Sequence, residues 1–178
     1  MDNQRFLNYF YDEAIQQNPR RFEKFIIEYF HDVIGCKVVN ENKDNVCEVC
    51  SSNCSNTMFL VKGCFIRDIY KRKKEISLRF IDTFKRIKVN IGLRYQKVSG
   101  NIELFYPIHA CDYMNGSYGR NFCLIVGGDV PNNSMNFINK NAPFPVLWTT
   151  SLMFPRLMKT YFGTGVRESK SIASKSIA

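Results

Sequence analysis

The sequence has very few histidines. Its 178 residues include two histidines, His31 and His109, and one tryptophan. Histidine is the most frequent general acid or base, so this scarcity restricts the possible active sites. The run Gly127-Gly128-Asp129 lacks the further Gly, Lys and Ser/Thr of a phosphate-binding loop, so we expect a tight turn there. These absences favour a binding protein over an enzyme.

Long apolar runs are also absent. No stretch approaches the roughly 20 apolar residues that span a bilayer. The first residues lead into an amphipathic segment and not into the apolar region of a secretory signal. We therefore expect an intracellular, soluble protein of the cytoplasm, the nucleus or both, with no membrane span. The seven cysteines are an odd number, which fits a reducing compartment better than a disulfide framework.

Acidic residues are scarce in one segment, and this gives the strongest functional signal in the sequence. Residues 67–97, here called the basic segment, hold eleven Lys or Arg and three acids, so their net charge is +8. The other 147 residues hold fourteen basic and thirteen acidic side chains and are almost neutral. Because a one-sided charge attracts polyanions, the basic segment predicts a binding site.

Nucleic acid is the polyanion that the basic segment fits best. Clustered cations release the counterions of phosphate backbones, and the compact run Lys71-Arg72-Lys73-Lys74 suits phosphate contact or nuclear import. Basic side chains on one face of a strand, with an aromatic residue beside them, also suit single strands, and RNA is slightly favoured over DNA. The predicted contact residues are Lys71, Arg72, Lys73, Lys74, Arg79, Arg86, Lys88, Arg94, Lys97 and Phe105.

Two other interpretations of the basic segment stay open. It forms a solvated strand face that discourages aggregation, or it docks onto an acidic protein or a membrane surface. In the second case the chain is a protein-interaction or structural module, such as a capsid or host-adaptor protein, and a homo-oligomer is compatible with it. Frequent Asn, Ile, Lys, Phe and Tyr are typical of AT-rich genomes, so a viral protein is among the expectations.

Four cysteines within 18 positions predict a structural zinc site. Tetrahedral zinc takes four sulfur or nitrogen ligands, and a spacing of two residues lets one turn supply two of them. The expected ligands are Cys47, Cys50, Cys54 and Cys64. Cys36 or His31 could take the place of Cys64, and a set of free thiols is the competing interpretation.

A cysteine-dependent enzyme is the remaining alternative. The run His109-Ala110-Cys111-Asp112 brings an imidazole, a thiol and a carboxylate together near an expected strand end. On a strand, residues 109 and 111 would point to the same face. Neighbouring pairs of this kind are more often packing residues, because Cys/His sites usually assemble from distant positions.

Hydrophobic periodicity predicts a single α+β domain over residues 1–163 and a polar tail over residues 164–178. Residues 1–35 are expected to form a helical hairpin, with helices over residues 5–17 and 19–34. Asn18 and Pro19 suit the start of the second helix, and Gly35 suits its end.

The rest of the domain is expected to form an antiparallel or mixed sheet and a short C-terminal helix. The expected parts are a cysteine-rich loop and strand (36–66), a basic sheet region (67–127), and a loop and helix (128–163). Alternating apolar residues predict an antiparallel hairpin over residues 87–108, in which Arg86, Lys88 and Arg94 share a polar face. The expected local structures are short strands over 37–39 and 58–66, a buried strand over 121–126, a loop over 129–145 and a helix over 155–162. Residues 74–84 suit either a helix or a strand, and the helix is favoured.

Overall fold

The structure is a computed structural model that describes residues 18–40, 57–96 and 102–163, without the side chains of residues 103 and 104. Several predictions fall outside the described residues. They are the first helix of the expected hairpin, the ligands Cys47, Cys50 and Cys54, the contact residue Lys97 and the tail over residues 164–178.

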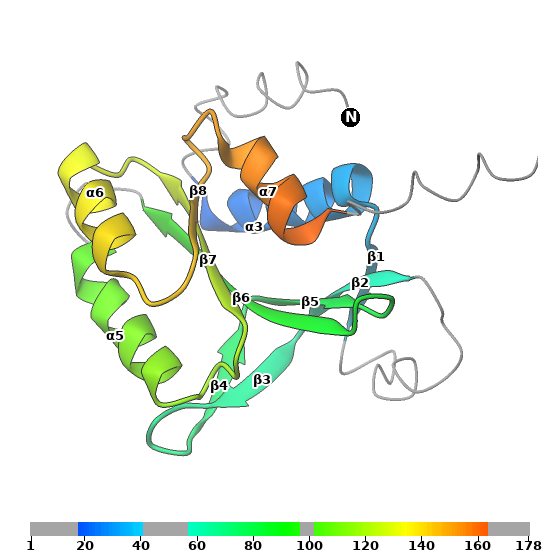
Figure 1. The fold of residues 1–178 in the computed structure, drawn as a ribbon, viewed down its shortest axis with the longest axis horizontal. Coiled ribbons are helices and arrows are strands. Elements are labelled where there is room, and N and C mark those ends of the chain that lie inside the picture. Colours follow the sequence, from blue (N-terminus) through cyan, green and yellow to red (C-terminus); the bar gives the residue numbers. More distant parts are fainter. Residues whose placement is uncertain (1–17, 41–56, 97–101, 164–178) are drawn as a thin grey trace, which may run out of the picture.

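A mixed sheet of six strands forms the middle layer of the molecule (Figure 1). The neighbours β2, β5 and β6 are antiparallel, whereas β1 runs parallel to β2, and β6, β7 and β8 run parallel to one another. In sheet order the strands are β1 (Lys37–Asn40), β2 (Met58–Lys62), β5 (Leu78–Asp82), β6 (Ile87–Gln96), β7 (Phe122–Gly128) and β8 (Val146–Trp148). This confirms an α+β domain with a mixed sheet.

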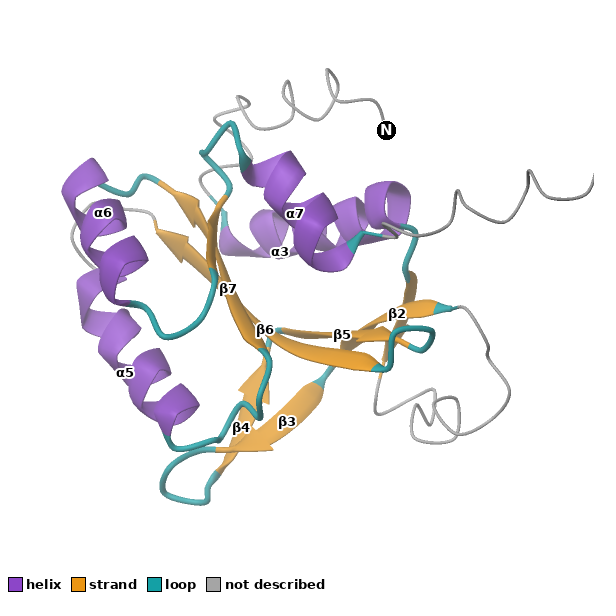
Figure 2. Ribbon diagram, viewed as in Figure 1, coloured by secondary structure: helices purple, strands orange, loops and turns teal. Residues whose placement is uncertain are grey.

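Helices cover both faces of the sheet (Figure 2). One face packs against α3 (Pro19–Tyr29), its π-helical continuation η1 (Phe30–Ile34) and α7 (Phe154–Phe162). The other face packs against α5 (Ile102–Met114) and α6 (Asn132–Asn141). Alternate residues of a strand point to opposite faces, and Ile125 accordingly belongs to the first core whereas Leu124 and Val126 belong to the second.

The core beneath α3 and α7 is rich in aromatic rings. Phe162 meets Phe30 and Phe80 edge to face, with ring centroids 5.0 and 5.1 Å away. Gly127 lets the Phe22 ring approach the sheet, because a Cβ atom at this glycine would lie 2.4 Å from that ring. The two chain segments thus pack more closely than any larger residue would allow.

A second, two-stranded sheet extends from the first. β3 (Cys64–Arg67) follows β2 after Gly63 alone, and β4 (Lys73–Ile76) is separated from β5 by Ser77 alone. Because β2 pairs with β5 and β3 with β4, the four strands form one long hairpin that bends at these two residues. We call its outer half, residues 64–76, the hairpin arm; it projects at the bottom of Figure 1.

The strongest local signals are confirmed. Asn18 caps α3 by accepting a hydrogen bond from the Arg20 amide at 2.9 Å, Pro19 is the first helical residue, and Gly35 ends the helix at φ +84°. The strands expected over 37–39, 58–66 and 121–126 and the helix over 155–162 are also present. None of the described helices is long and apolar enough to cross a membrane.

Four expectations are wrong. Residues 102–108 belong to α5 and not to a strand, so the hairpin over 87–108 does not form. Residues 74–84 form β4 and β5 instead of a helix, and the loop over 129–145 contains α6. Strand β7 also runs on through Gly127 and Gly128, where we expected a turn. In each case contacts with distant segments outweigh a weak local pattern.

Candidate nucleic-acid interface

The structure divides the basic segment among three places. Its first part lies in the hairpin arm and its middle part in the turn between β5 and β6, whereas Arg79 is buried against β6 and β3 and Arg94 lies between the sheet and α5. In Figure 1 the arm lies at the bottom and the β5–β6 turn at the right, so these two exposed parts are well separated. They do not form one continuous surface.

The tip of the hairpin arm is a compact turn organised by Asp68. Its carboxylate accepts hydrogen bonds from the Tyr70 and Arg72 amides, both at 2.9 Å, and from the Arg72 Nε at 2.8 Å. The bond from Arg72 is the main reason that the pKa of Asp68 is lowered. The Arg72 guanidinium in turn lies 4.8 Å from the centroid of the Tyr70 ring, which is 70% exposed. Asp68 therefore fixes a cation beside an exposed aromatic ring.

The outer face of the arm carries exposed cations and an aromatic ring. Phe65, Arg67, Lys73 and Glu75 are exposed, whereas the residues between them on β3 and β4 face inward. The Lys73 Nζ lies 3.8 Å from the centroid of the Phe65 ring. Within the described part of the chain, neither Lys73 nor the exposed Lys71 forms an ion pair.

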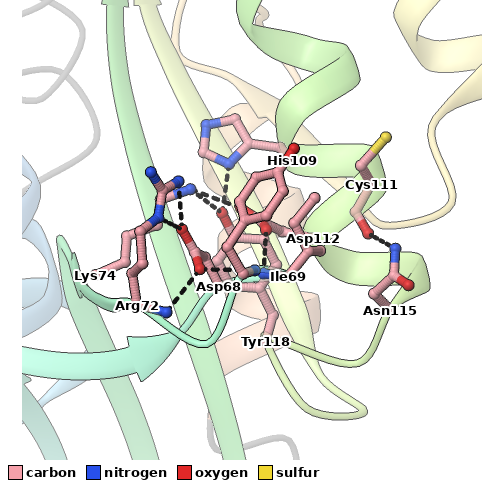
Figure 3. A network of polar contacts seen from close by, with 10 residues as sticks. Asp68, Ile69, Arg72, Lys74, His109, Cys111, Asp112, Asn115 and Tyr118 are labelled. Carbon is pink, nitrogen blue, oxygen red and sulfur yellow. Dashed lines mark hydrogen bonds and ion pairs between the residues drawn. The ribbon is translucent and has the colours of Figure 1, made fainter.

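The inner face of the arm is attached to α5 by a polar network (Figure 3). Asp112, which is 3% exposed, accepts a bond from Lys74 Nζ at 2.7 Å and one from the Ile69 amide at 3.4 Å. Burial alone would lower the pKa of Lys74, but Asp112 and Tyr118 outweigh burial and raise it. Lys74 therefore stays charged and pairs with Asp112, which holds the arm against the helix.

His109 closes this network from the other side. Its Nδ1 lies 2.7 Å from the Tyr118 hydroxyl, which also accepts a bond from Lys74 Nζ at 3.4 Å. The direction of the bond between Tyr118 and His109 depends on which nitrogen of the imidazole carries the proton. Burial, reinforced by the charges of Lys74 and Arg94, lowers the pKa of His109 to about 4. The imidazole is therefore neutral at pH 7.

A groove of about 710 Å³ lies between the tip of the arm and α5. Its lining combines three cations, two carboxylates, apolar side chains and one thiol, so the charge around it is weakly positive. The lining residues are Asp68, Ile69, Tyr70, Arg72, Lys73, Lys74, Pro107, Ile108, Cys111 and Asp112. Such a volume is typical of small-molecule sites, which range from about 300 to 1,000 Å³.

The turn between β5 and β6 presents the second exposed basic patch. The Asp82 carboxylate accepts bonds from the Phe84 and Lys85 amides, both at 3.0 Å, and Arg86 takes a left-handed backbone at φ +54°. Arg86 and Lys88 are exposed, whereas Lys85 donates to the Gly163 carbonyl at 2.9 Å. The predicted contacts Arg86 and Lys88 are thus accessible, but distant from the arm.

The expected polar face of β6 is exposed at Lys88, but further along the strand the fold covers Asn90 and Gln96, and Arg94 packs against α5. The Arg94 guanidinium lies 3.3 Å from the centroid of the Phe105 ring, a pairing that we expected between two strands and that instead joins β6 to α5. Arg79 is 8% exposed and donates to Asn90 Oδ1 at 2.9 Å, and Gln96 is 3% exposed. Arg79 and Arg94 therefore support the interior of the fold.

The expected zinc ligands lie mostly outside the described residues. Cys64, the one that is described, is 0% exposed and its thiol donates to the Val61 carbonyl at 3.7 Å. Of the two substitutes, Cys36 is buried, which raises its pKa to about 12, and the exposed His31 bonds to Asp32 at 2.7 Å. Residues 18–40, 57–96 and 102–163 contain no group of three or more metal-binding side chains. The zinc prediction therefore rests on sequence spacing.

Cys111 and His109 do not share one face, as they would on a strand. Both belong to α5, where residues two apart point roughly 200° away from each other. In Figure 3 the Cys111 sulfur points away from the imidazole, which faces Tyr118. Cys111 is exposed in the groove, whereas His109 belongs to the buried network.

No protein-family model matches the chain, and no curated protein or solved structure matches it either. Sequence reasoning missed Asp68, Tyr70 and Tyr118, which organise the arm and its groove, and assigned Asp112 to a different arrangement beside Cys111. The local signal was weak, because residues 64–66 are all apolar and residues 74–76 are Lys, Glu and Ile, so neither segment shows the alternation that is typical of a hairpin strand.

Proposed function

We propose that the protein binds nucleic acid without acting on it chemically, that single-stranded RNA is favoured over DNA, and that the hairpin arm makes the primary contact. One observation carries this proposal. The arm presents exposed Arg67, Lys71 and Lys73 beside the exposed rings of Phe65 and Tyr70. Cations that follow the backbone, together with aromatic rings on which bases stack, are the usual means of binding single strands.

The arm suits this role better than the other basic positions. Its cations project from the molecule on a hairpin that Asp112 attaches to α5. Among the described residues, no carboxylate forms an ion pair with Lys71 or Lys73. Arg86 and Lys88, at the β5–β6 turn, add a second patch that strengthens the positive field. The proposed location is the cytoplasm or the nucleus, where RNA is found.

Fluorescence anisotropy with a labelled single-stranded RNA, measured over a range of salt concentrations, tests the proposal. The triple variant Arg67→Ala, Lys71→Gly, Lys73→Ala removes three exposed cations, and glycine suits the φ of +62° at Lys71. Each lost phosphate contact lowers the slope of log affinity against log salt by about 0.7 for single strands. We expect a slope lower by about 2 and a large loss of affinity at low salt.

The matched control removes the same charge from the opposite parts of the surface. Lys140, Arg156 and Lys159 are exposed on α6 and α7, so their replacement by Ala should leave the salt slope nearly unchanged. Equal losses in both triple variants, or no binding at low salt, contradict the proposal. Competition by polyglutamate as strong as by unlabelled RNA would instead favour an acidic protein partner.

We also propose that Cys47, Cys50 and Cys54 hold a structural zinc ion, with Cys64 as the fourth ligand. The spacing of the first three supports this, because it suits a single turn around a tetrahedral metal. Native mass spectrometry should show one zinc per chain, which a chelator or the Cys50→Ser variant removes, whereas Cys123→Ser retains it. A metal-free mass from zinc-supplemented expression contradicts the proposal.

A further inference from the structure

We infer that the groove between the hairpin arm and α5 is a subsite for one unpaired nucleotide of the bound strand. This inference rests on the proposed function, and it names the part of the ligand that the molecule selects. The base would stack on Tyr70, and the adjoining phosphate would lie near Lys73, both of which line the groove.

Tyr70 forms a preorganised stacking platform. The Arg72 guanidinium lies over its ring at 4.8 Å, and Asp68 holds that guanidinium through Nε at 2.8 Å and Nη2 at 2.7 Å. One face of the ring is thus covered by a fixed cation, while the ring remains 70% exposed and so has a face free for a base. A ring that is already held in place loses little conformational freedom when a base stacks on it.

The walls of the groove suit a flat, partly apolar ligand. Ile69 and Ile108 are 40% and 54% exposed, and together with Pro107 they give the groove an apolar side. The volume of about 710 Å³ is too large for a lone phosphate ion and fits the range of sites for small organic ligands. A nucleobase can place its apolar faces against such walls and keep its polar edges in water, so it fits an open groove with one apolar side.

The charges around the groove place the phosphate at its rim. Arg72 and Lys74 are each paired with a carboxylate, Asp68 and Asp112 respectively. Lys73 has no ion pair with a described residue and lies over the Phe65 ring, at the boundary between the groove and the outer face of the arm. It is therefore the lining cation available to a phosphate. A base inside a duplex is stacked on both sides and cannot enter, so the groove selects unpaired nucleotides.

Cys111 provides a reporter inside the groove. It is exposed and lines the groove, and the tryptic peptide of residues 98–120 contains it as the sole cysteine. The experiment follows alkylation of the wild-type protein by iodoacetamide, measured on this peptide by mass spectrometry. It is done without RNA, with a single-stranded RNA of ten nucleotides, and with a blunt duplex of the same sequence. We expect the single strand to slow alkylation about tenfold or more and the duplex to leave it unchanged.

Affinity measurements on variants of Tyr70 complete the test. Tyr70→Ala should weaken binding of the single strand about tenfold, and Tyr70→Phe should retain it, because stacking on an aromatic ring contributes about that factor per base. Tyr161→Ala, at a tyrosine that is 47% exposed on α7, is the matched control and should bind like the wild type.

The outcomes separate the two ideas. Normal RNA binding with no protection of Cys111, or with no loss in Tyr70→Ala, overturns the nucleotide subsite and leaves the proposed function standing. Protection by the duplex as strong as by the single strand also overturns it. Absence of RNA binding by the wild-type protein overturns the proposed function, and the subsite with it.

Discussion

At the scale of single residues, His109 is the group whose protonation most affects the fold. It belongs to α5, is bonded to Tyr118 and lies close to the cations Lys74 and Arg94, and its pKa is lowered from 6.5 to about 4. Protonation would add a charge to a largely buried imidazole that already lies near two cations. The folded protein therefore resists binding this proton, whereas the unfolded chain accepts it at an ordinary pKa.

The stabilising effect of the neutral His109 is therefore complete above pH 6.5 and is lost as the pH falls toward 4. Between pH 7 and pH 5 the free energy of unfolding should fall by about 2 kcal/mol through this residue alone. In the variant His109→Gln, which keeps a side chain able to donate or accept a hydrogen bond beside Tyr118, this part of the pH dependence should disappear. Urea denaturation at both pH values measures it.

The other histidine supplies the control. His31 is exposed at the end of the first described helix and bonds to the neighbouring Asp32. The variant His31→Gln should keep the same difference in stability between pH 7 and pH 5 as the wild type. If His109→Gln retains that full difference as well, the burial of a neutral imidazole is not its cause.

At the scale of elements, the tip of the hairpin arm depends on Asp112 for its position. Its inner residues Cys64, Ile66 and Ile76 are buried, but its tip is held mainly by Asp112, which binds both Lys74 and the Ile69 amide. A carboxylate that is buried and shared by two donors is costly to remove, because both donors lose their partner.

The variant Asp112→Ala should loosen the arm more than the rest of the fold. We expect the free energy of unfolding to fall by about 2 kcal/mol. This is less than for a fully buried ion pair, because Lys74 is 33% exposed. Hydrogen exchange should accelerate at the amides of residues 66–74 and not at those of β6 and β7. Asp129→Ala, at an exposed aspartate, is the control. Uniform acceleration in all strands would show that Asp112 supports the whole domain instead.

The helix α5 shows how tertiary contacts overrule a local pattern. Residues 102–108 alternate like a strand and include Pro107, which interrupts the helical hydrogen bonds. Ile102 and Tyr106 are nevertheless buried, 1% and 8% exposed, one helical turn apart in the core that α5 shares with α6. The gain from burying these side chains exceeds the cost of the proline.

At the scale of the whole molecule, one sheet is shared by two cores. The aromatic core beneath α3 and α7 and the core beneath α5 and α6 consist of opposite faces of the same strands. Each core therefore needs the other to hold the sheet in place. The cations of the basic segment that the fold leaves exposed lie on the hairpin arm and at the β5–β6 turn, where a polyanion can reach them.

Cooperation between the two cores predicts a single unfolding transition. Phe154 is 0% exposed in the core beneath α7, and Phe154→Ala should cost about 3 to 4 kcal/mol. The sole tryptophan, Trp148, belongs to the other core, where its indole donates to Asn139 at 2.7 Å. In Phe154→Ala, the fluorescence of Trp148 and the circular dichroism signal should nevertheless both show the full shift of the urea midpoint. An unchanged Trp148 midpoint contradicts the single domain, and Tyr161→Ala should shift neither signal.

Elements with strong local signals were predictable. The helix that begins at Asn18 and Pro19 has both a cap and a periodic apolar stripe, and strand β7 is a short apolar run next to glycines. Such patterns act between residues a few positions apart, so the sequence contains all the information they need. The charge of +8 over residues 67–97 is likewise a property of the chain itself.

The surface that uses this charge was decided by the tertiary structure. An alternating strand such as β6 has two faces, and whether Arg94 meets solvent or Phe105 depends on where α5 packs, which long-range contacts determine. The groove beside Tyr70 likewise exists because Asp112, more than 40 positions away, holds the hairpin tip against the helix. By itself the sequence determined that the chain carries a concentrated positive charge. Only the packing of distant segments decided which cations stay exposed, because burial of a charged side chain depends on its neighbours in space.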